Sequence, residues 1–187
     1  SEMGGTLPER EFLRQGLEII ERLTNSEIGF IHFVNDDQES IELVGWTAGA
    51  RKGCTAVHEN HYPMGTAGIW ADCARSKKIA VFNDYANYRA KMGLPEGHAP
   101  LHRLISVPVI EEGKVRVILG VGNKASDYDE ADCTTAQLIG NDLWRIVRRA
   151  RAEKALAEKL DELIALNSRL DETNNKLLQS ENLASIG

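Results

Sequence analysis

Three cysteines and five histidines are the residues of this chain best suited to nucleophilic or metal chemistry. Cys54 lies between Gly53 and Thr55 in a polar stretch, and we take it as the candidate reactive thiol. Cys73 and Cys133 fall in helical patterns, where a cysteine usually serves as a small core residue. The odd number and wide spacing of the cysteines argue against a disulfide framework and favour a reducing compartment.

Two pairs of histidines have spacings that metal sites use. They are His58-Glu-Asn-His61 and His98-x-x-x-His102, and either pair needs a third ligand to hold zinc or iron. Neither pair lies on a predicted helix, and loops commonly hold histidines that face solvent. We therefore predict no metal site, and the sequence requires no cofactor.

A long irregular stretch between residues 84 and 102 has chemistry suited to ligand binding. Loops of this length inside compact domains are usually functional or disordered, and Leu94-Pro-Glu-Gly97 fits a type I turn. We predict a pocket over one face of a sheet, closed by this loop. The candidate ligand-binding residues are Tyr62, Trp70, Asn83, Tyr85, His98 and Arg103. An equally weighted alternative is that these side chains only fasten the loop by hydrogen bonds.

Composition restricts the class of protein. An apolar content of 42% supports a real core, while a formal net charge of −6 argues against nucleic-acid binding. No run is long and apolar enough for a membrane span, and no secretory leader is present. We expect a cytoplasmic protein segment without membrane contact.

Periodicity predicts an α/β (α+β) fold, with helices flanking a central antiparallel sheet of about five to six strands. The capping-box pattern Thr6-Leu-Pro-Glu9 precedes a helical stripe of Leu13, Leu17 and Ile20. The strands predicted are 28–34, 41–47, 79–82, 104–110 and 115–121. Residues 48–64 are expected to be irregular, and 66–76 to form a short helix. A long closing helix begins near Asp129.

Beyond residue 150 this closing helix carries a heptad pattern of alternating four- and three-residue steps. The positions are Leu156, Leu160, Leu163, Asn167, Leu170, Asn174 and Leu177. Asparagines at a positions pair across the seam of a parallel, in-register dimer. We therefore predict a homodimer with these residues at its interface. The alternative is a helix folded back on its own domain, but the chain has no second stripe of similar length.

Several short motifs between residues 62 and 132 resemble the GAF domains of bacterial sensor proteins. They are Tyr62-Pro63, Ala67-Gly68-x-Trp70, Asn83-Asp84-Tyr85, Gly93-Leu-Pro-Glu-Gly-His98, Arg103, Val107-Pro108-Val109, Asn123-Lys124 and Tyr128-x-x-x-Asp132. The resemblance implies a tail or tag remnant at 1–8, a GAF sensory domain at 9–150 and a coiled-coil signalling helix at 151–187. It also implies a small-molecule or partner signal.

The final residues, LLQSENLASIG (177–187), are similar to the entry of the dimerisation and phosphotransfer domain of sensor histidine kinases. The resemblance implies an input segment of a two-component kinase that uses ATP and has a response regulator as its partner. We expect the phosphoacceptor histidine to lie beyond Gly187, so no catalytic residue is assigned in this chain.

Other members of the same family offer different functions. A thiol enzyme of the methionine sulfoxide reductase type would need reactive cysteines, and a ligand-free dimerisation scaffold would need no site. Attachment of a linear tetrapyrrole usually involves a Cys-His step, which this sequence lacks. Cyclic-nucleotide binding is associated with a signature that matches only in part, because Cys133 stands where a glutamate is expected.

Overall fold

The computed structural model describes residues 7–52, 61–88 and 100–184 of the chain. The chain divides into two compact units, Ser1–Arg145 and Ile146–Gly187, and each is described by itself. Helix α4 (Glu130–Ala184) contributes to both units because the division falls within it. In the described ranges, no helix combines the length and apolar character that crossing a membrane requires.

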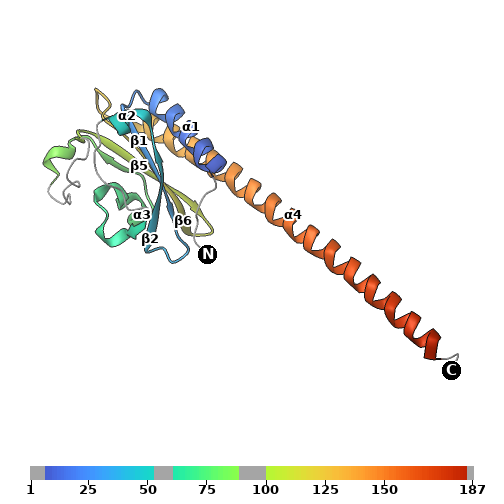
Figure 1. The fold of residues 1–187 in the computed structure, drawn as a ribbon. Coiled ribbons are helices and arrows are strands. Elements are labelled where there is room, and N and C mark those ends of the chain that lie inside the picture. The colour runs from blue at the N-terminus through green and yellow to red at the C-terminus, as the bar shows by residue number, and fades with distance from the viewer. Residues whose placement is uncertain (1–6, 53–60, 89–99, 185–187) are drawn as a thin grey trace. The chain divides into compact units, whose positions relative to one another are not determined.

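The first unit is built on one six-stranded sheet in which all neighbouring strands are antiparallel. The bounds are β1 Ile28–Val34, β2 Ser40–Trp46, β3 His61–Pro63, β4 Ala80–Phe82, β5 Leu104–Glu111 and β6 Lys114–Gly122. The spatial order is β3-β2-β1-β6-β5-β4, which places β1 and β6 at the centre. The predicted α/β fold with an antiparallel sheet and a long closing helix is confirmed (Figure 1).

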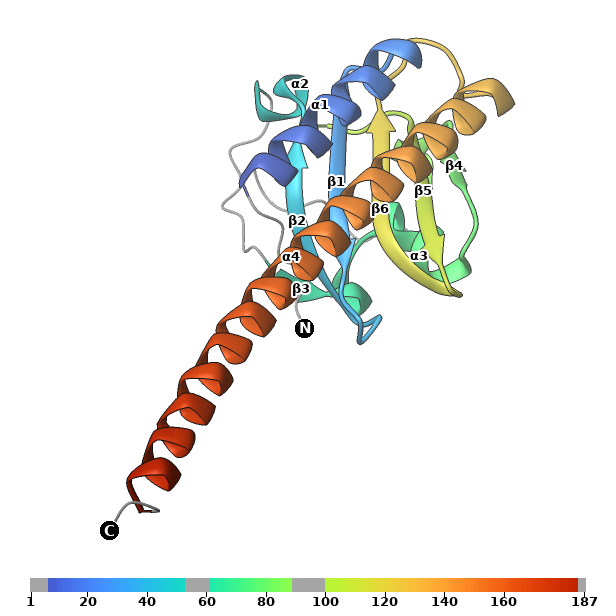
Figure 2. The same ribbon diagram turned by 90° about the vertical axis from the view of Figure 1, so that its right-hand side faces the viewer.

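Two helices cover one face of this sheet. Helix α1 (Leu7–Leu23) and the part of α4 in this unit lie across the strands, with the short helix α3 (Asp72–Ser76) on the far side (Figure 2). The stripe predicted from the sequence is fully buried, because Leu13, Leu17 and Ile20 have no exposed surface. Helix α1 is also fastened at its start, where Arg10 forms an ion pair with the buried Glu42 of β2.

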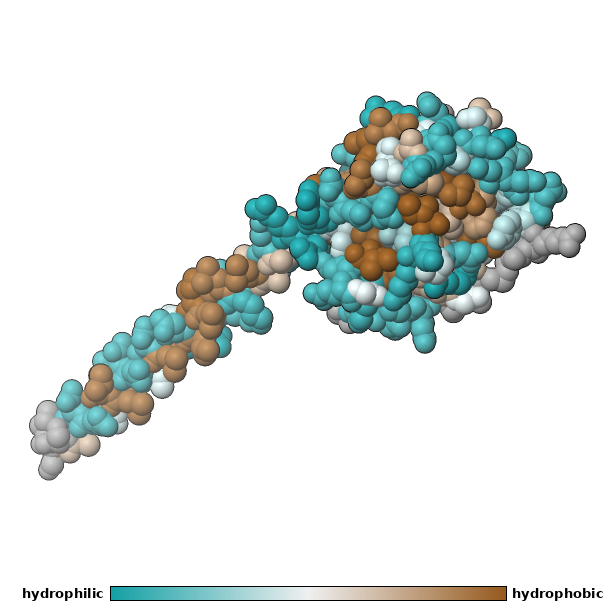
Figure 3. All heavy atoms as spheres, turned by 180° about the vertical axis from the view of Figure 1, so that it is seen from behind, coloured by the Kyte–Doolittle hydropathy of each residue, from teal (hydrophilic) through white to brown (hydrophobic). Residues whose placement is uncertain are grey.

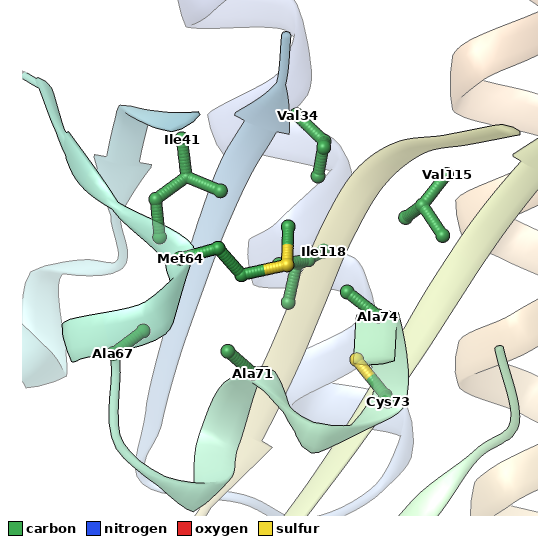
Figure 4. Packing of buried hydrophobic residues seen from close by; sticks show 9 residues of the cluster. All are labelled: Val34, Ile41, Met64, Ala67, Ala71, Cys73, Ala74, Val115 and Ile118. Carbon is green, nitrogen blue, oxygen red and sulfur yellow. The ribbon is translucent and has the colours of Figure 1, made fainter. Parts of the chain in front are cut away.

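The opposite face is covered by short elements. They are α2 (Ala48–Lys52), the 3-10 helices η1 (Met64–Thr66), η2 (Ile69–Ala71) and η3 (Tyr85–Asn87), and α3. Small side chains of η2 and α3, together with Met64, pack against the ends of β1, β2 and β6 (Figure 4). The elements can therefore approach the sheet closely, since alanine and cysteine occupy little space there.

The structure corrects two sequence expectations in this region. Residues 48–64 are not wholly irregular, because α2 and β3 form within them, although 53–60 lie outside the described residues. Residues 66–76 do not form one helix. The Arg75 side chain donates hydrogen bonds to the carbonyls of Met64 (2.8 Å) and Gly68 (3.2 Å), and this bonding holds the chain in separate short turns.

Two register shifts interrupt the ladders. One lies between Ile31 and His32 in the pairing of β1 with β2, and the other between Val109 and Ile110 in the pairing of β5 with β6. The second follows Pro108, and a proline within a sheet is usually confined to an edge strand, a strand start or a bulge. Pro108 also lies past the end of the β4 pairing, so its missing N–H leaves no ladder bond unmade there.

The second unit is the continuing helix α4 from Ile146. All five leucines of the predicted seam are exposed, with 53–71% of their surface accessible. Apolar side chains gather along this helix (Figure 3). Its charged residues form ion pairs within the helix, for example Arg149 with Glu153, and exposed pairs of this kind contribute little stability. The dimer interface assigned to this seam stays a prediction.

Gly16 allows α1 and α4 to approach closely in the first unit. A Cβ atom at Gly16 would lie 2.4 Å from a Leu143 methyl group. We expect Gly16→Ala to destabilise the protein by about 1–3 kcal/mol, as overpacked cores do, and the further change Leu143→Ala to relieve the clash. Urea denaturation measures both effects. Gly45→Ala is the control, because nothing lies within 4 Å of its Cβ position. Equal effects of Gly16→Ala and Gly45→Ala would contradict the close approach.

Candidate functional site

Three aromatic rings form a cluster on the sheet face opposite α1 and α4. The His32 ring stacks on Trp70 of η2, with centroids 4.7 Å apart and planes inclined by 25°. Phe30 meets both rings edge-on, at 5.3 Å from Trp70 and 5.6 Å from His32. Gly120 of β6 makes room for this arrangement, because a Cβ there would lie 2.3 Å from the Phe30 ring.

Burial keeps the His32 imidazole neutral. Only 5% of its surface is exposed, and desolvation lowers its pKa from 6.5 to about 3. A neutral imidazole stacked on an indole presents a flat, uncharged surface. His32 was not among the predicted site residues, although a single histidine within the apolar run IGFIHFV is a detectable signal.

Two buried hydroxyl groups lie on the same face without hydrogen-bond partners among the described residues. They are the Ser106 Oγ atom of β5 and the Tyr85 Oη atom of η3. Ser106 is fully buried and Tyr85 is 2% exposed. A buried polar group normally finds a partner, and leaving one unpaired costs about 1–3 kcal/mol. The Ser106 hydroxyl lies beside the Cys73 thiol, so Tyr85 has the hydroxyl that is left without a neighbouring polar side chain in the described structure.

The thiols of the described cysteines are poorly suited to nucleophilic chemistry. Cys73 is fully buried among alanines and aliphatic side chains (Figure 4). Burial raises its pKa to about 12, although the nearby Ser106 hydroxyl partly opposes this shift. Burial and neighbouring carboxylates also raise the pKa of Cys133 on α4. The candidate reactive thiol, Cys54, lies outside the described residues.

The six sequence-predicted ligand residues do not gather at one place. Trp70 and Tyr85 both pack on the sheet face just described, in a cluster that includes Phe82 and Leu104. Tyr62 lies in β3 opposite Ile41, and its side chain is not described. His98 lies outside the described residues.

Asn83 and Arg103 instead reach the segment that leads into α4. The Asn83 carboxamide accepts a hydrogen bond from the Tyr128 N–H (2.8 Å) and donates one to the Tyr128 carbonyl (3.1 Å). The Arg103 guanidinium donates to Asp127 at 3.0 Å. For these two side chains the geometry favours the fastening alternative of the sequence analysis.

The prediction that the chain has no metal site concerns histidines of which only some are described. Within the ranges that the structure describes, no three histidine, cysteine, aspartate or glutamate side chains are placed to hold a metal ion. His58 and His98 lie outside these ranges, as does the side chain of His61. The absence of a metal site in the whole chain stays a prediction.

The architecture defines the chain as an α/β domain with an antiparallel sheet, helices on one face, and a buried cluster of aromatic and hydroxyl groups on the other. The family model of the GAF domain matches residues 6–148, and the chain therefore belongs to the GAF domain family. The same assignment was expected from the motifs around Trp70, Asn83 and Tyr128.

One curated relative is the methyl sulfide methyltransferase-associated sensor of Methanosarcina acetivorans, 30% identical over 155 residues. The alignment covers 82% of this chain but 16% of that protein's length.

Solved structures share the fold at low identity. The GAF domain of a phosphoenolpyruvate-protein phosphotransferase from Coxiella burnetii has a TM-score of 0.65 and 16% identity, covering 79% of this chain and 86% of that one. A free methionine-R-sulfoxide reductase from Thermoplasma acidophilum has a TM-score of 0.58 and 10% identity, covering 75% of this chain and 93% of that one.

The buried imidazole predicts a specific dependence of stability on pH. The unfolded chain protonates His32 near pH 6.5, whereas the folded protein does so only near pH 3. The unfolded state therefore binds more protons between these values, and the free energy of unfolding falls as pH decreases from 6.5 toward 3. Relative to His32→Phe, we expect the wild type to lose about 2–3 kcal/mol between neutral pH and pH 4.5.

Denaturant titrations across this pH range measure the difference between the two proteins. His102→Asn is the control, because it changes an exposed histidine. A constant difference between wild type and His32→Phe would show that His32 protonates normally in the folded state.

Proposed function

We propose that this chain is the sensory GAF input segment of a two-component sensor histidine kinase, and that its ligand binds on the sheet face carrying Trp70 and Tyr85. The proposal is supported most directly by the buried hydroxyl of Tyr85, which lacks a hydrogen-bond partner in the described structure. The sequence similarity of residues 177–187 to a phosphotransfer entry supports the kinase context. The M. acetivorans relative, whose name describes it as a sensor, supports the sensory role.

The chemistry of this face favours an uncharged and largely apolar ligand. The packed apolar side chains on it are aromatic, aliphatic and small ones. His32 adds a neutral imidazole, since its pKa is about 3. A flat molecule with one or two hydrogen-bonding groups would stack on the rings and satisfy the Tyr85 hydroxyl.

The thiol-enzyme alternative has less support. The sulfoxide reductases among the similar structures share the fold at low identity. Nucleophilic chemistry depends on a thiolate, and Cys73, with a pKa of about 12, carries almost none at neutral pH.

Ligand retention tests the sensory function. We expect a small molecule to co-purify with the protein from cells and to be detected by mass spectrometry after denaturation. Tyr85→Phe should lower its affinity about tenfold, because one hydrogen bond to the ligand is lost. Tyr88→Phe is the matched control, since Tyr88 is 44% exposed. In the sensor histidine kinase of which we propose this chain to be a segment, the same molecule should change the rate of ATP-dependent histidine phosphorylation.

A face that binds no ligand would give the opposite result for these variants. If the hydroxyls of Tyr85 and Ser106 are only defects of a closed core, Tyr85→Phe and Ser106→Ala will both stabilise the protein, because each removes an unpaired buried group. That result, together with the absence of any bound molecule, would leave the dimerisation scaffold as the better function.

The second part of the proposal is a parallel homodimer through α4. In the predicted register, the g and e′ positions pair Lys159 with Ile164, Leu166 with Asp171, and Thr173 with Leu178. None of these pairs joins opposite charges, so interhelical salt bridges would not fix the register. Asn167 and Asn174 are left as the residues that specify it.

Replacing both asparagines tests this role. We expect Asn167→Leu with Asn174→Leu to tighten self-association about tenfold or more while loosening register or oligomer number. Sedimentation equilibrium measures association, and disulfide crosslinking of single cysteines introduced along α4 reports register. Asn175→Leu, at a b position, is the control. A double variant that remains a strict dimer in one register would show that the asparagines do not specify the register. A wild-type protein that stays monomeric at all concentrations would refute the homodimer.

A further inference from the structure

Four segments of the first unit meet where α4 begins. Ser26, which follows α1, contributes its hydroxyl, 2.7 Å from the Tyr128 Oη atom. The segment after β6 contributes the backbone N–H of Lys124, which donates to the same oxygen at 3.3 Å. The end of β4 contributes Asn83, and α4 itself contributes Asp132. Tyr128 lies at the centre of these contacts and is 4% exposed.

Tyr128 directly precedes the residues that set the start of α4. The Asp129 carboxylate accepts a hydrogen bond from the Asp132 N–H (3.0 Å), and the Asp132 carboxylate accepts one from the Asp129 N–H (3.1 Å). This reciprocal capping fixes the first turn of the helix. Asp132 also pairs with Lys124 at 2.5 Å, with both side chains largely buried. The Tyr128 backbone is joined directly to this capped first turn, so a displacement of Tyr128 acts on the start of the helix.

Asn83 connects this point to the candidate ligand face. Its planar carboxamide bonds to both the N–H and the carbonyl of Tyr128, which fixes direction as well as distance. In the chain, Asn83 lies between Phe82 and Tyr85, and both rings pack in the cluster on the sheet face, 6.2 Å apart and edge-on. Figure 2 shows β4 close to the start of α4.

We propose that the Asn83 carboxamide is a coupling residue that transmits displacement of the Tyr85 segment to the first turn of α4. This inference rests on the proposed sensory function. A ligand that reaches the Tyr85 hydroxyl shifts η3 and the end of β4. The two hydrogen bonds between Asn83 and Tyr128 then either move Tyr128 with this segment or break. Both outcomes change the start of the helix, so ligand-bound and ligand-free states differ there.

A merely structural role for Asn83 predicts something different. The bonds would then stabilise the junction by the same amount whatever happens at Tyr85, and the effects of substitutions at the two positions would add. Coupling requires that the effect of a change at Tyr85 on α4 depends on Asn83. A double-mutant comparison separates these cases without any ligand.

The experiment measures hydrogen exchange of peptides covering residues 130–137 in the whole 187-residue chain. Wild type, Tyr85→Leu, Asn83→Ala and the double variant are compared. In the wild-type background, we expect Tyr85→Leu to speed exchange in this first part of α4 about tenfold. In the Asn83→Ala background, Tyr85→Leu should produce no further change there. Asn87→Ala is the control, because Asn87 bonds only to the neighbouring Asp84 in the described contacts.

A second pair of variants guards against loss of folding. Tyr85→Phe is milder than Tyr85→Leu, and Asn83→Asp keeps the acceptor for the Tyr128 N–H while placing an oxygen against the Tyr128 carbonyl. Equal effects of the Tyr85 change in both Asn83 backgrounds would overturn the coupling. The experiment uses no ligand, so it can fail separately from the proposed function. Coupling in a protein that retains no small molecule would refute the sensory function but not the coupling. Ligand binding without coupling would refute the coupling but not the sensory function.

Discussion

The alternation of side chains along β1 is the constraint on which the rest of the first unit depends. This strand lies between β2 and β6 and is buried on both faces. Ile31 and Phe33 point toward α1 and α4, and Phe33 meets Trp144 edge-on at 6.3 Å. Phe30 and His32 point the other way, toward Trp70. One strand therefore joins the helical layer to the candidate site, because its alternate side chains pack against both.

Predicted site residues that are close in the sequence lie at two different places in the structure. Trp70 and Tyr85 pack on the sheet face, where the buried Tyr85 hydroxyl has no partner in the described structure. Asn83 and Arg103 lie at the start of α4, where hydrogen bonds to Tyr128 and Asp127 fasten the helix. The separation suits a sensory module, since the residues that recognise a molecule need not be those that hold the output helix.

The long elements could be predicted because their patterns are local. The stripe of Leu13, Leu17 and Ile20 specifies a helix, and the apolar run Ile28–Val34 specifies a strand, whatever the rest of the chain does. The short turns around Trp70 could not be predicted in the same way. Arg75 holds them through carbonyls of residues up to 11 positions away, and no local propensity encodes such bonds.

Only those residues of the candidate site with a conspicuous residue type could be predicted from the sequence. Trp70 and Tyr85 are aromatic residues beside a long loop, and the sequence selected them. His32 and Ser106 lie inside apolar strands, where residue type alone does not distinguish them from core positions, and only the structure shows that both side chains are buried. Asn83 was predicted to bind a ligand, and its carboxamide bonds to Tyr128 at the start of α4, a contact that the sequence does not reveal.

The register shift between Ile31 and His32 decides which way a tryptophan faces. Opposite this step, β2 carries one residue more than β1, since Gly45 pairs with Ile31 while Leu43 pairs with His32. Strict alternation from Leu43 would turn Trp46 toward the helices. The additional residue, Val44, resets the phase, so Trp46 pairs with Phe30 and shares its side of the sheet. A β2 strand without this additional residue would turn Trp46 away from the sheet face that carries the candidate site.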